Sequence, residues 1–547
     1  MEINQQIISI KKLFTEKNIT QLISLLNQIL SQQKSNSNTL SLYVENGLLT
    51  EMTELFQLNS QKITYLVLEI LGELTFYEGN RSKISNNQIF EHVISLFDKN
   101  DTEIWRLIIR LFANLCVDSD ENQEKIHQKK IIDKVLKVFQ NTSTTETNLL
   151  RSCVVFILNM SFGNAEIQLE FGKKQAIVYL VSLLKIKNQK ELLILSLRAL
   201  SVLMELKENH KYLANINYIL SFLEFMENLD GEIQELSFEI FYRISSEEKC
   251  RLEIINNQLI LRILSLEKLN LSPENLNFYY RFLAYLSLEE KATQIMIEQN
   301  CHLIASKLME SQDIEIVISS VMWLGNLIRT EQNRIHFQDF PNMIKSMIEL
   351  SSDQRIQSQY LSVSALSWLS LNPRIAKMIS EMNGFTSLMK VIKGKYPKRV
   401  RYCASRIITN IVLNTESQEK LCNFIKNQLS YAISYLMKSE YNTLKFEGIS
   451  ILRHLTTQET TKNCLFSNHF KLEGIKSLLH SQNNDILDAL SETLISCLDN
   501  NQAKKVLFKI IDDLKDASLS ISINTSVETR LQECFKILEL QKEEKRK

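Results

Sequence analysis

The segment RLFANLCVDSDENQEKI, residues 110–126, decides how the whole chain is interpreted. It places an arginine, an asparagine, a cysteine and several carboxylates within a few positions, and these residue types suit a thiol nucleophile, a metal site or an anion pocket. The same segment has Asn114 between apolar residues, followed by a polar corner and then Ile126. This second pattern recurs along the chain, so the segment is one copy of a structural repeat.

The repeat has eleven copies, and the position of Asn114 is filled in turn by Glu73, Asn114, Asn159, Glu205, Arg243, Tyr285, Asn326, Trp368, Asn410, His454 and Cys497. Successive copies are 38 to 46 residues apart, with a mean of about 42, which is the spacing of armadillo and HEAT repeats. A second apolar stretch with helical spacing, such as IIDKVLKVF at 131–139, lies between copies. A short, a middle and a long third helix per unit is the armadillo arrangement.

We therefore predict an all-α fold, a right-handed superhelical armadillo solenoid of about eleven to twelve repeats. Composition agrees, because 44% of the residues are hydrophobic while Gly is only 11 and Pro only 4, too few for the turns of an all-β fold. We expect N-terminal capping helices at 1–50, the solenoid at 51–515, and a C-terminal capping helix with a charged tail at 516–547. The Ser/Thr-rich stretches 141–148 and 516–529 are expected to be corner loops.

Charge and cysteine usage limit the partners and the compartment. The chain carries 63 basic and 63 acidic residues, so no overall charge would hold it on nucleic acid or an anionic membrane. It opens MEINQQIISIKKLF without the apolar core of a signal peptide. We expect a cytoplasmic monomer with no nucleic-acid partner and no direct membrane insertion. The nine cysteines form no C-x-x-C pair, which favours reduced, buried thiols over disulfides or zinc ligands.

Catalytic signatures such as H-E-x-x-H, G-x-S-x-G and G-x-x-x-x-G-K-[ST] are missing from the sequence. In the opening segment, Leu115 and Cys116 are expected at the packed end of a third helix, with DSDEN as the corner after it. We therefore predict no catalytic residue, no cofactor and no metal. The chain is expected to act by binding another protein, and an enzyme is the least favoured class.

The third helices of armadillo repeats line one concave face, so the residue at the Asn114 position and the residue four before it share a groove. This groove is mixed, with carboxylates at Glu69 and Glu73 and aromatic rings at Tyr285 and Trp368. It lacks the regular tryptophans of importin-α proteins and the long basic surface of the catenins. Each groove asparagine could bond the adjacent repeat or a partner, each ring could be a hot spot or pack internally, and the carboxylates could be an ordinary solvated face.

Several segments, taken in order, carry a resemblance beyond the generic repeat: RLFANLCVDSDENQEKI, FILNMSFGNAEIQLEFGKKQAIVYLVSLL, FEIFYRISSEEKCRLEIINNQLILRIL, FLAYLSLEEKATQIMIEQN, MWLGNLIRTEQNRIHFQDFPNMIKSMIEL, SVSALSWLSLNPRIAKMI and KGKYPKRVRYCASRIITNIV. Their order resembles the SmgGDS family, armadillo proteins that stimulate GDP dissociation from small GTPases. The resemblance spans about residues 105–415. Total length and repeat count are also similar to the family.

The resemblance implies that the protein holds Rho-, Rap- or Ras-type GTPases on its C-terminal repeats and loosens their nucleotide pocket, or chaperones their polybasic, prenylated tails. Asn326 in LGNLIR matches the family's groove asparagine, whereas Trp368 stands where the next repeat of the family has Asn. The implied GTPase-binding groove comprises Asn326, Met322, Trp368, Asn410, Arg406, Tyr285 and Arg281, with Glu69 and Glu73 for the basic tail and Asn114 and Asn159 continuing the ladder. The alternative is an armadillo scaffold for another partner, such as a cytoskeletal or ciliary adaptor.

Overall fold

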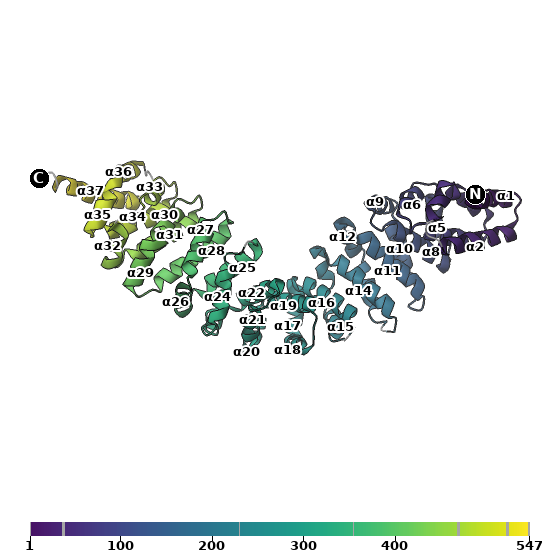
Figure 1. Ribbon diagram of the computed structural model, residues 1–547, viewed down its shortest axis with the longest axis horizontal. Coiled ribbons are helices and arrows are strands. Elements are labelled where there is room, and N and C mark those ends of the chain that lie inside the picture. The colour runs from purple at the N-terminus through teal and green to yellow at the C-terminus, as the bar shows by residue number, and fades with distance from the viewer. Residues whose placement is uncertain are drawn as a thin grey trace. The chain divides into compact units, whose positions relative to one another are not determined.

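The structure, a computed structural model, describes residues 2–35, 39–186, 188–228, 230–353, 355–467, 471–520 and 525–544. Helices fill most of these ranges, and no strand occurs within them. The chain divides into two compact units, residues 1–282 and 283–547, and the division lies inside helix α19 (Pro273–Leu286). Within each unit the helices stack in chain order (Figure 1).

Consecutive sets of three helices build both units, which confirms the predicted all-α repeat. Besides α19, the third helices are α5 (Gln61–Leu74), α8 (Thr102–Leu115), α11 (Thr147–Ser161), α14 (Lys190–Leu203), α16 (Gly231–Ser245), α22 (Ile314–Leu327), α25 (Ile356–Leu369), α28 (Lys398–Leu413), α31 (Asn442–Leu455) and α34 (Asn484–Cys497). Each packs against the third helix before it within its unit, as α11 does on α8 and α28 on α25.

The other two helices of each set are shorter. The first helices are α6 (Glu78–Ser85), α9 (Asp120–Gln128), α12 (Ala165–Lys173), the 3₁₀ helix η4 (Lys207–Tyr212), α17 (Glu248–Asn256), α20 (Glu290–Glu298), α23 (Glu331–Ile335), α26 (Pro373–Glu381), α29 (Gln418–Phe424), α32 (Glu459–Ser467) and α35 (Asn501–Leu507). The second helices are α7 (Ile89–Ser95), α10 (Ile131–Asn141), α13 (Ala176–Leu183), α15 (Ile216–Met226), α18 (Ile260–Ser265), α21 (Cys301–Leu308), α24 (Pro341–Leu350), α27 (Gly384–Lys393), α30 (Ser430–Met437), α33 (Glu473–Leu479) and α36 (Ile511–Ser520).

At the N-terminus, α1 (Glu2–Thr15) and α2 (Ile19–Ser35) precede a complete three-helix set of α3 (Leu40–Glu45), α4 (Leu48–Leu55) and α5. At the C-terminus, α37 (Thr525–Glu544) packs on α34 and α36 as the third helix of the last set. The predicted corner loop at 141–148 is confirmed, because α10 ends at Asn141 and α11 begins at Thr147.

The predicted loop at 516–529 is wrong, because α36 runs to Ser520 and α37 begins at Thr525. Residues 521–524 of that stretch lie outside the described residues. Ala517 and Val527 are buried, so packing of a few apolar side chains outweighs the low helix propensity of the surrounding Ser and Thr. The charged end at 545–547 also lies outside the described residues.

Helix α8 shows how the opening segment folds. The Asp101 carboxylate caps its start by accepting hydrogen bonds from the backbone N–H groups of Glu103 and Ile104, both at 3.0 Å. The helix ends at Leu115, and Cys116 is fully buried, with its Sγ 3.4 Å from Met160 Sδ. Burial raises the pKa of the Cys116 thiol far above neutrality, so the thiolate that a nucleophile needs is not populated. The segment is a packed repeat corner, as predicted.

Buried polar side chains at the corners satisfy the last carbonyl groups of the third helices, which have no partner inside their own helix. Asn80, Asn209 and Asn333, each on a first helix, donate from Nδ2 to the carbonyls of Leu74, Leu203 and Leu327 at 3.0, 2.9 and 2.8 Å. The next residue often does the same, as the guanidiniums of Arg81, Arg251 and Arg334 each donate to a carbonyl at the end of the preceding third helix. These caps fix the angle at which the chain turns from one repeat into the next.

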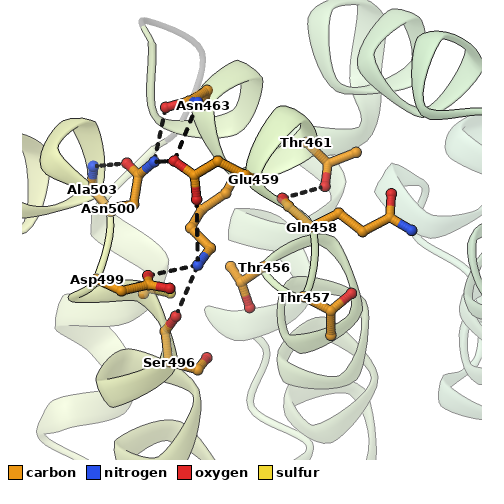
Figure 2. A network of polar contacts seen from close by, with 12 residues as sticks. Thr456, Thr457, Gln458, Glu459, Thr461, Asn463, Ser496, Asp499, Asn500 and Ala503 are labelled. Atoms are coloured by element: carbon orange, nitrogen blue, oxygen red, sulfur yellow. Dashed lines mark hydrogen bonds and ion pairs between the residues drawn. The ribbon is translucent and has the colours of Figure 1, made fainter.

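In α32 the equivalent of these arginines is Lys462, which is buried and joins two consecutive repeats. Its Nζ donates to the Ser496 carbonyl at 3.1 Å and to Asp499 Oδ1 at 2.6 Å. Asn500 donates from Nδ2 to Glu459 Oε1 at 2.5 Å, and Figure 2 shows this bond beside Ala503 of α35. The ammonium is thereby neutralised and hydrogen-bonded, as a buried charge requires.

Candidate binding surface along the third helices

Four asparagines at the repeat position, Asn114, Asn159, Asn326 and Asn410, have the same arrangement, and we call them the ladder asparagines. Each donates from Nδ2 to the C-terminal end of the third helix before it, at 3.0 Å to Thr75 Oγ1, 3.0 Å to the Ala113 carbonyl, 2.7 Å to the Ala284 carbonyl and 2.8 Å to Ser370 Oγ. Their Oδ1 atoms accept no hydrogen bond from the described part of the chain. The amide group therefore bonds the adjacent repeat with one end and keeps an acceptor at the other.

Arg243 occupies the same position in α16 and keeps the bond to the neighbouring repeat. Its Nη1 donates to the Ser201 carbonyl at 2.5 Å, and its Nη2 donates to Glu239 Oε1 at 2.6 Å. Ser201 also donates from its hydroxyl to Glu239 Oε2 at 2.7 Å. Arg243 thus replaces the neutral amide donor of the ladder asparagines with a charged guanidinium and adds an ion pair with Glu239.

Glu69 and Glu73, which the family resemblance implies for a basic tail, lie on α5 and are paired with cations of this chain. Glu73 is only 9% exposed, and its Oε1 lies 2.9 Å from Arg110 Nη2 on α8. Glu69 lies between Lys34 of α2 and Arg106 of α8, with N···O distances of 3.6 and 3.9 Å. A basic tail that binds here has to compete with Arg106, Arg110 and Lys34.

The remaining predicted groove residues are spread over several places. Arg281, at the end of unit 1, stacks on the Tyr242 ring with its guanidinium 5.8 Å from the ring centre. Tyr285 and Met322, in unit 2, are half-buried. Asn326 lines a cleft of about 360 Å³ together with Arg329 and residues of α20.

Trp368 and Arg406 do come together. They line one cleft of about 290 Å³ between α25 and α28, and we call it the basic cleft; its lining is Tyr360, Ser364, Ser367, Trp368, Leu371, Arg399, Tyr402, Cys403 and Arg406. Trp368 is 44% exposed. Arg399, Tyr402 and Tyr360 were not selected from the sequence, although the run KYPKRVR at 395–401 is a signal that could have indicated them.

The electrostatics of the basic cleft are dominated by its arginines. Arg406 has one carboxylate within 4 Å among the described residues, Glu447 at 3.8 Å. Burial raises the pKa of Glu447, and the Thr409 hydrogen bond and the Arg406 charge oppose that shift. Burial likewise raises the pKa of Cys403, against the opposing charges of Arg399 and Arg406.

A second cleft, in unit 1, is mainly apolar and has a volume of about 410 Å³. Val117, Leu158, Val202 and Leu236 line it beside the ladder residue Asn159. Phe162 stands at its edge and is 60% exposed. The two clefts differ in chemistry, one apolar and one cationic.

In the parts of the chain that the structure describes, no three His, Cys, Asp or Glu side chains lie close enough together to form a potential metal site. Among the helices of the described ranges, none combines the length and the apolar character needed to cross a membrane.

Comparison with known proteins identifies the fold. No protein-family model matches the chain, and no curated protein matches it significantly in sequence. A crystal structure of an engineered protein matches with a TM-score of 0.62 and 17% identity, covering 74% of this chain and 98% of that one. A structure from work on a phosphorylation switch that controls the interaction between cadherin and β-catenin matches with a TM-score of 0.69 and 11% identity, covering 88% of this chain and 96% of that one. With the three-helix repeats described above, these matches show that the chain is an all-α, armadillo-like helical solenoid.

Proposed function

We propose that this solenoid binds a small GTPase of the Rho, Rap or Ras type along its third helices, and that binding stimulates GDP dissociation or chaperones the tail of the GTPase. The observation that carries the binding role is the arrangement of the ladder asparagines, which hold Nδ2 in place and leave Oδ1 as an acceptor. An acceptor fixed in orientation by its own repeat loses little entropy when a partner N–H group binds it. The identity of the partner rests on the resemblance to the SmgGDS family.

Exchange activity of this kind needs no acid, base or nucleophile. A protein that binds the nucleotide-free GTPase more tightly than the loaded form lowers the affinity of the GTPase for nucleotide by the same factor. Surface complementarity to one state of the GTPase is sufficient, and this agrees with a chain that carries no known catalytic signature.

The tail of the GTPase would bind unit 1 under this proposal. The apolar cleft beside Phe162 offers a surface for a hydrophobic tail, and Glu69 and Glu73 offer carboxylates to basic side chains. Both carboxylates are already paired with Arg106 and Arg110. The binding free energy that a basic tail gains here is therefore only the difference between its new ion pairs and the ones it replaces.

Fluorescent-GDP release tests the proposal directly. The full-length protein is mixed with Rho, Rap and Ras proteins loaded with fluorescent GDP, each with and without its basic tail. We expect faster release from at least one of them, and slower binding without the tail. If none of the GTPases binds, the GTPase role is contradicted and the scaffold role for another protein remains, since the ladder acceptors suit any partner with exposed N–H groups.

Substitution of Asn326 by Ala tests the ladder. We expect GTPase affinity to fall by about 1–3 kcal/mol because the Oδ1 acceptor is lost. The 2.7 Å bond from Nδ2 to the Ala284 carbonyl is lost as well, so we also expect the free energy of unfolding to fall by about 0.5–1.5 kcal/mol.

Asn209→Ala is the matched control for Asn326→Ala. Asn209 also donates from Nδ2 to backbone carbonyls but is fully buried in a corner of unit 1, so its loss should lower stability and leave GTPase affinity unchanged. Titration calorimetry and thermal unfolding measure the two quantities separately. Unchanged affinity in Asn326→Ala would assign this asparagine to packing alone.

A further inference from the structure

The stretch from residue 382 to residue 415 has a strong local excess of positive charge. It contains seven Lys or Arg residues and no Asp or Glu, in a chain whose charges balance overall. It spans α27, the turn after it and α28, whose Arg399 and Arg406 line the basic cleft. Two of the seven cations therefore line a concave site.

Few carboxylates of the chain neutralise this charge. Within the described residues, the pair of Arg406 with Glu447 at 3.8 Å is the one ion pair that any of the seven cations makes. Four of the cations lie instead over tyrosine rings, Arg399 over Tyr360 at 5.3 Å, Lys398 and Arg401 over Tyr441 at 4.9 and 5.5 Å, and Lys393 over Tyr431 at 5.9 Å. A cation–π contact positions a cation without cancelling its charge.

The opposite wall of the basic cleft is apolar and aromatic. Trp368 of α25 and Leu371, in the turn after it, are partly exposed and line the cleft together with the arginines of α28. Large aromatic side chains and arginines on an exposed concave surface are the residue types enriched at binding hot spots. The cleft thus offers a guanidinium pair on one side and an apolar contact on the other.

We propose that the basic cleft binds an acidic segment of a partner protein, with carboxylates of the segment on Arg399 and Arg406 and an apolar side chain against Trp368. The planar guanidinium matches a carboxylate with two parallel hydrogen bonds. This inference goes beyond the GTPase proposal and does not depend on it, because it follows from the charge and shape of the cleft.

A peptide fits these observations better than a nucleic acid. Single-stranded nucleic acids bind by stacking their bases on open aromatic faces beside a basic groove. Here Tyr360, Tyr431 and Tyr441 each have a cation over one face of the ring, which leaves fewer open faces for bases to stack on. A carboxylate next to an apolar side chain satisfies both walls of the cleft at once.

Fluorescence anisotropy with the full-length protein tests the inference. The probe is a short fluorescein-labelled peptide of Glu and Asp with one central Leu, and the matched neutral peptide replaces Glu by Gln and Asp by Asn. We expect the acidic peptide to bind about tenfold or more tightly than the neutral one, and its binding to weaken as the ionic strength rises to about 0.15 M.

Charge reversal locates the site. The variant Arg399→Glu with Arg406→Glu is expected to lower affinity for the acidic peptide by about tenfold or more. Lys345→Glu should leave this affinity unchanged, because Lys345 is an exposed lysine of α24 that makes no ion pair with the described residues. Thermal unfolding checks that both variants are folded. If the double variant does not fold, the single variant Arg399→Gln replaces it in the binding experiment. Trp368→Phe should abolish a change in tryptophan fluorescence on binding, because Trp323 is buried and Trp105, on α8 in unit 1, does not line the cleft.

Three outcomes would overturn the inference: equal affinity for the acidic and neutral peptides, equal affinity of the charge-reversal variant and the wild type, or tighter binding of oligo-dT or phosphatidylserine vesicles than of the acidic peptide. The last result would assign the cleft to nucleic acid or to membranes. Peptide binding together with no effect on any GTPase would support the acidic-segment site and contradict the GTPase proposal.

Discussion

In each ladder asparagine, the two ends of one side-chain amide differ: Nδ2 donates a hydrogen bond to the adjacent repeat, and Oδ1 accepts none from the described residues. In Asn326 the donor end holds the preceding repeat and the acceptor end accepts no hydrogen bond from the described residues, so contact with the adjacent repeat does not exclude contact with a partner. The cysteines are less uniform than predicted: none of the nine is in a disulfide and six are buried, but Cys403, Cys422 and Cys464 are partly exposed. Cys403 is one of the residues that line the basic cleft.

Histidine 210 should make stability depend on pH. It is buried, with Nδ1 2.9 Å from Ser246 Oγ and Nε2 2.9 Å from the Met204 carbonyl, and burial lowers its pKa below the ordinary 6.5. The unfolded chain then binds the proton more readily than the folded one, so this contribution is complete above pH 6.5 and is lost as pH falls through 6.5 toward the folded pKa.

We therefore expect the free energy of unfolding to fall between about pH 7 and pH 5.5, and to fall less in His210→Gln. Denaturant titrations at several pH values measure the difference between wild type and variant. Burial also lowers the pKa of His302 and His454, so the variant should remove only part of the slope. Identical pH dependence in the two proteins would contradict the assignment to His210.

At the scale of elements, the corners matter as much as the helices. Each third helix ends in carbonyl groups that its own backbone cannot satisfy, and a buried side chain of the next first helix satisfies them. The sequence predicted where the corners lie, because polar residues interrupt the apolar period there. It did not predict that Asn and Arg of the corners are inward-facing caps, since a polar residue at a corner ordinarily faces water.

Arg334→Leu tests the caps. Arg334 is 8% exposed and its Nη1 donates to the carbonyls of Ile328 and Arg329 at 3.2 and 2.9 Å. Loss of this charged donor leaves both carbonyls unpaired, and we expect the free energy of unfolding to fall by about 1.5–3 kcal/mol. Arg355→Leu is the control, because its side chain is 47% exposed and its ion pair with Asp353 lies at the surface, so its effect on the free energy of unfolding should be much smaller. Similar losses in both variants would contradict the capping role.

At the scale of the whole molecule, contacts connect mainly neighbouring repeats within each of the two units. Stability in such a chain is approximately a sum of repeat terms and nearest-neighbour terms, so local damage should stay local. Gly474 allows a test, because a Cβ added there would lie 2.9 Å from the Cα of Ser434 on α30.

We expect Gly474→Ala to destabilise its surroundings by about 1–3 kcal/mol, since α33 has to move away from α30. Hydrogen exchange should accelerate in the repeats around α30 and α33 and stay unchanged in unit 1. Gly325→Ala is the control, because no atom lies within 4 Å of the added Cβ and an alanine favours the helix. Acceleration throughout the chain would show that the chain unfolds as one cooperative body.

The sequence by itself determined the repeat, its period, its helical content and most of its corners, apart from the stretch 516–529, because these follow from local spacing of apolar residues along the chain. It also indicated the ladder positions, since they recur with the same period. Only the tertiary structure decided which side chains meet across repeats: that Glu73 is paired with Arg110, that each ladder amide directs Nδ2 inward, and that Arg399 and Trp368 form one cleft. Lateral packing of helices sets these contacts, and a periodic pattern does not encode the rotation of one helix against the next.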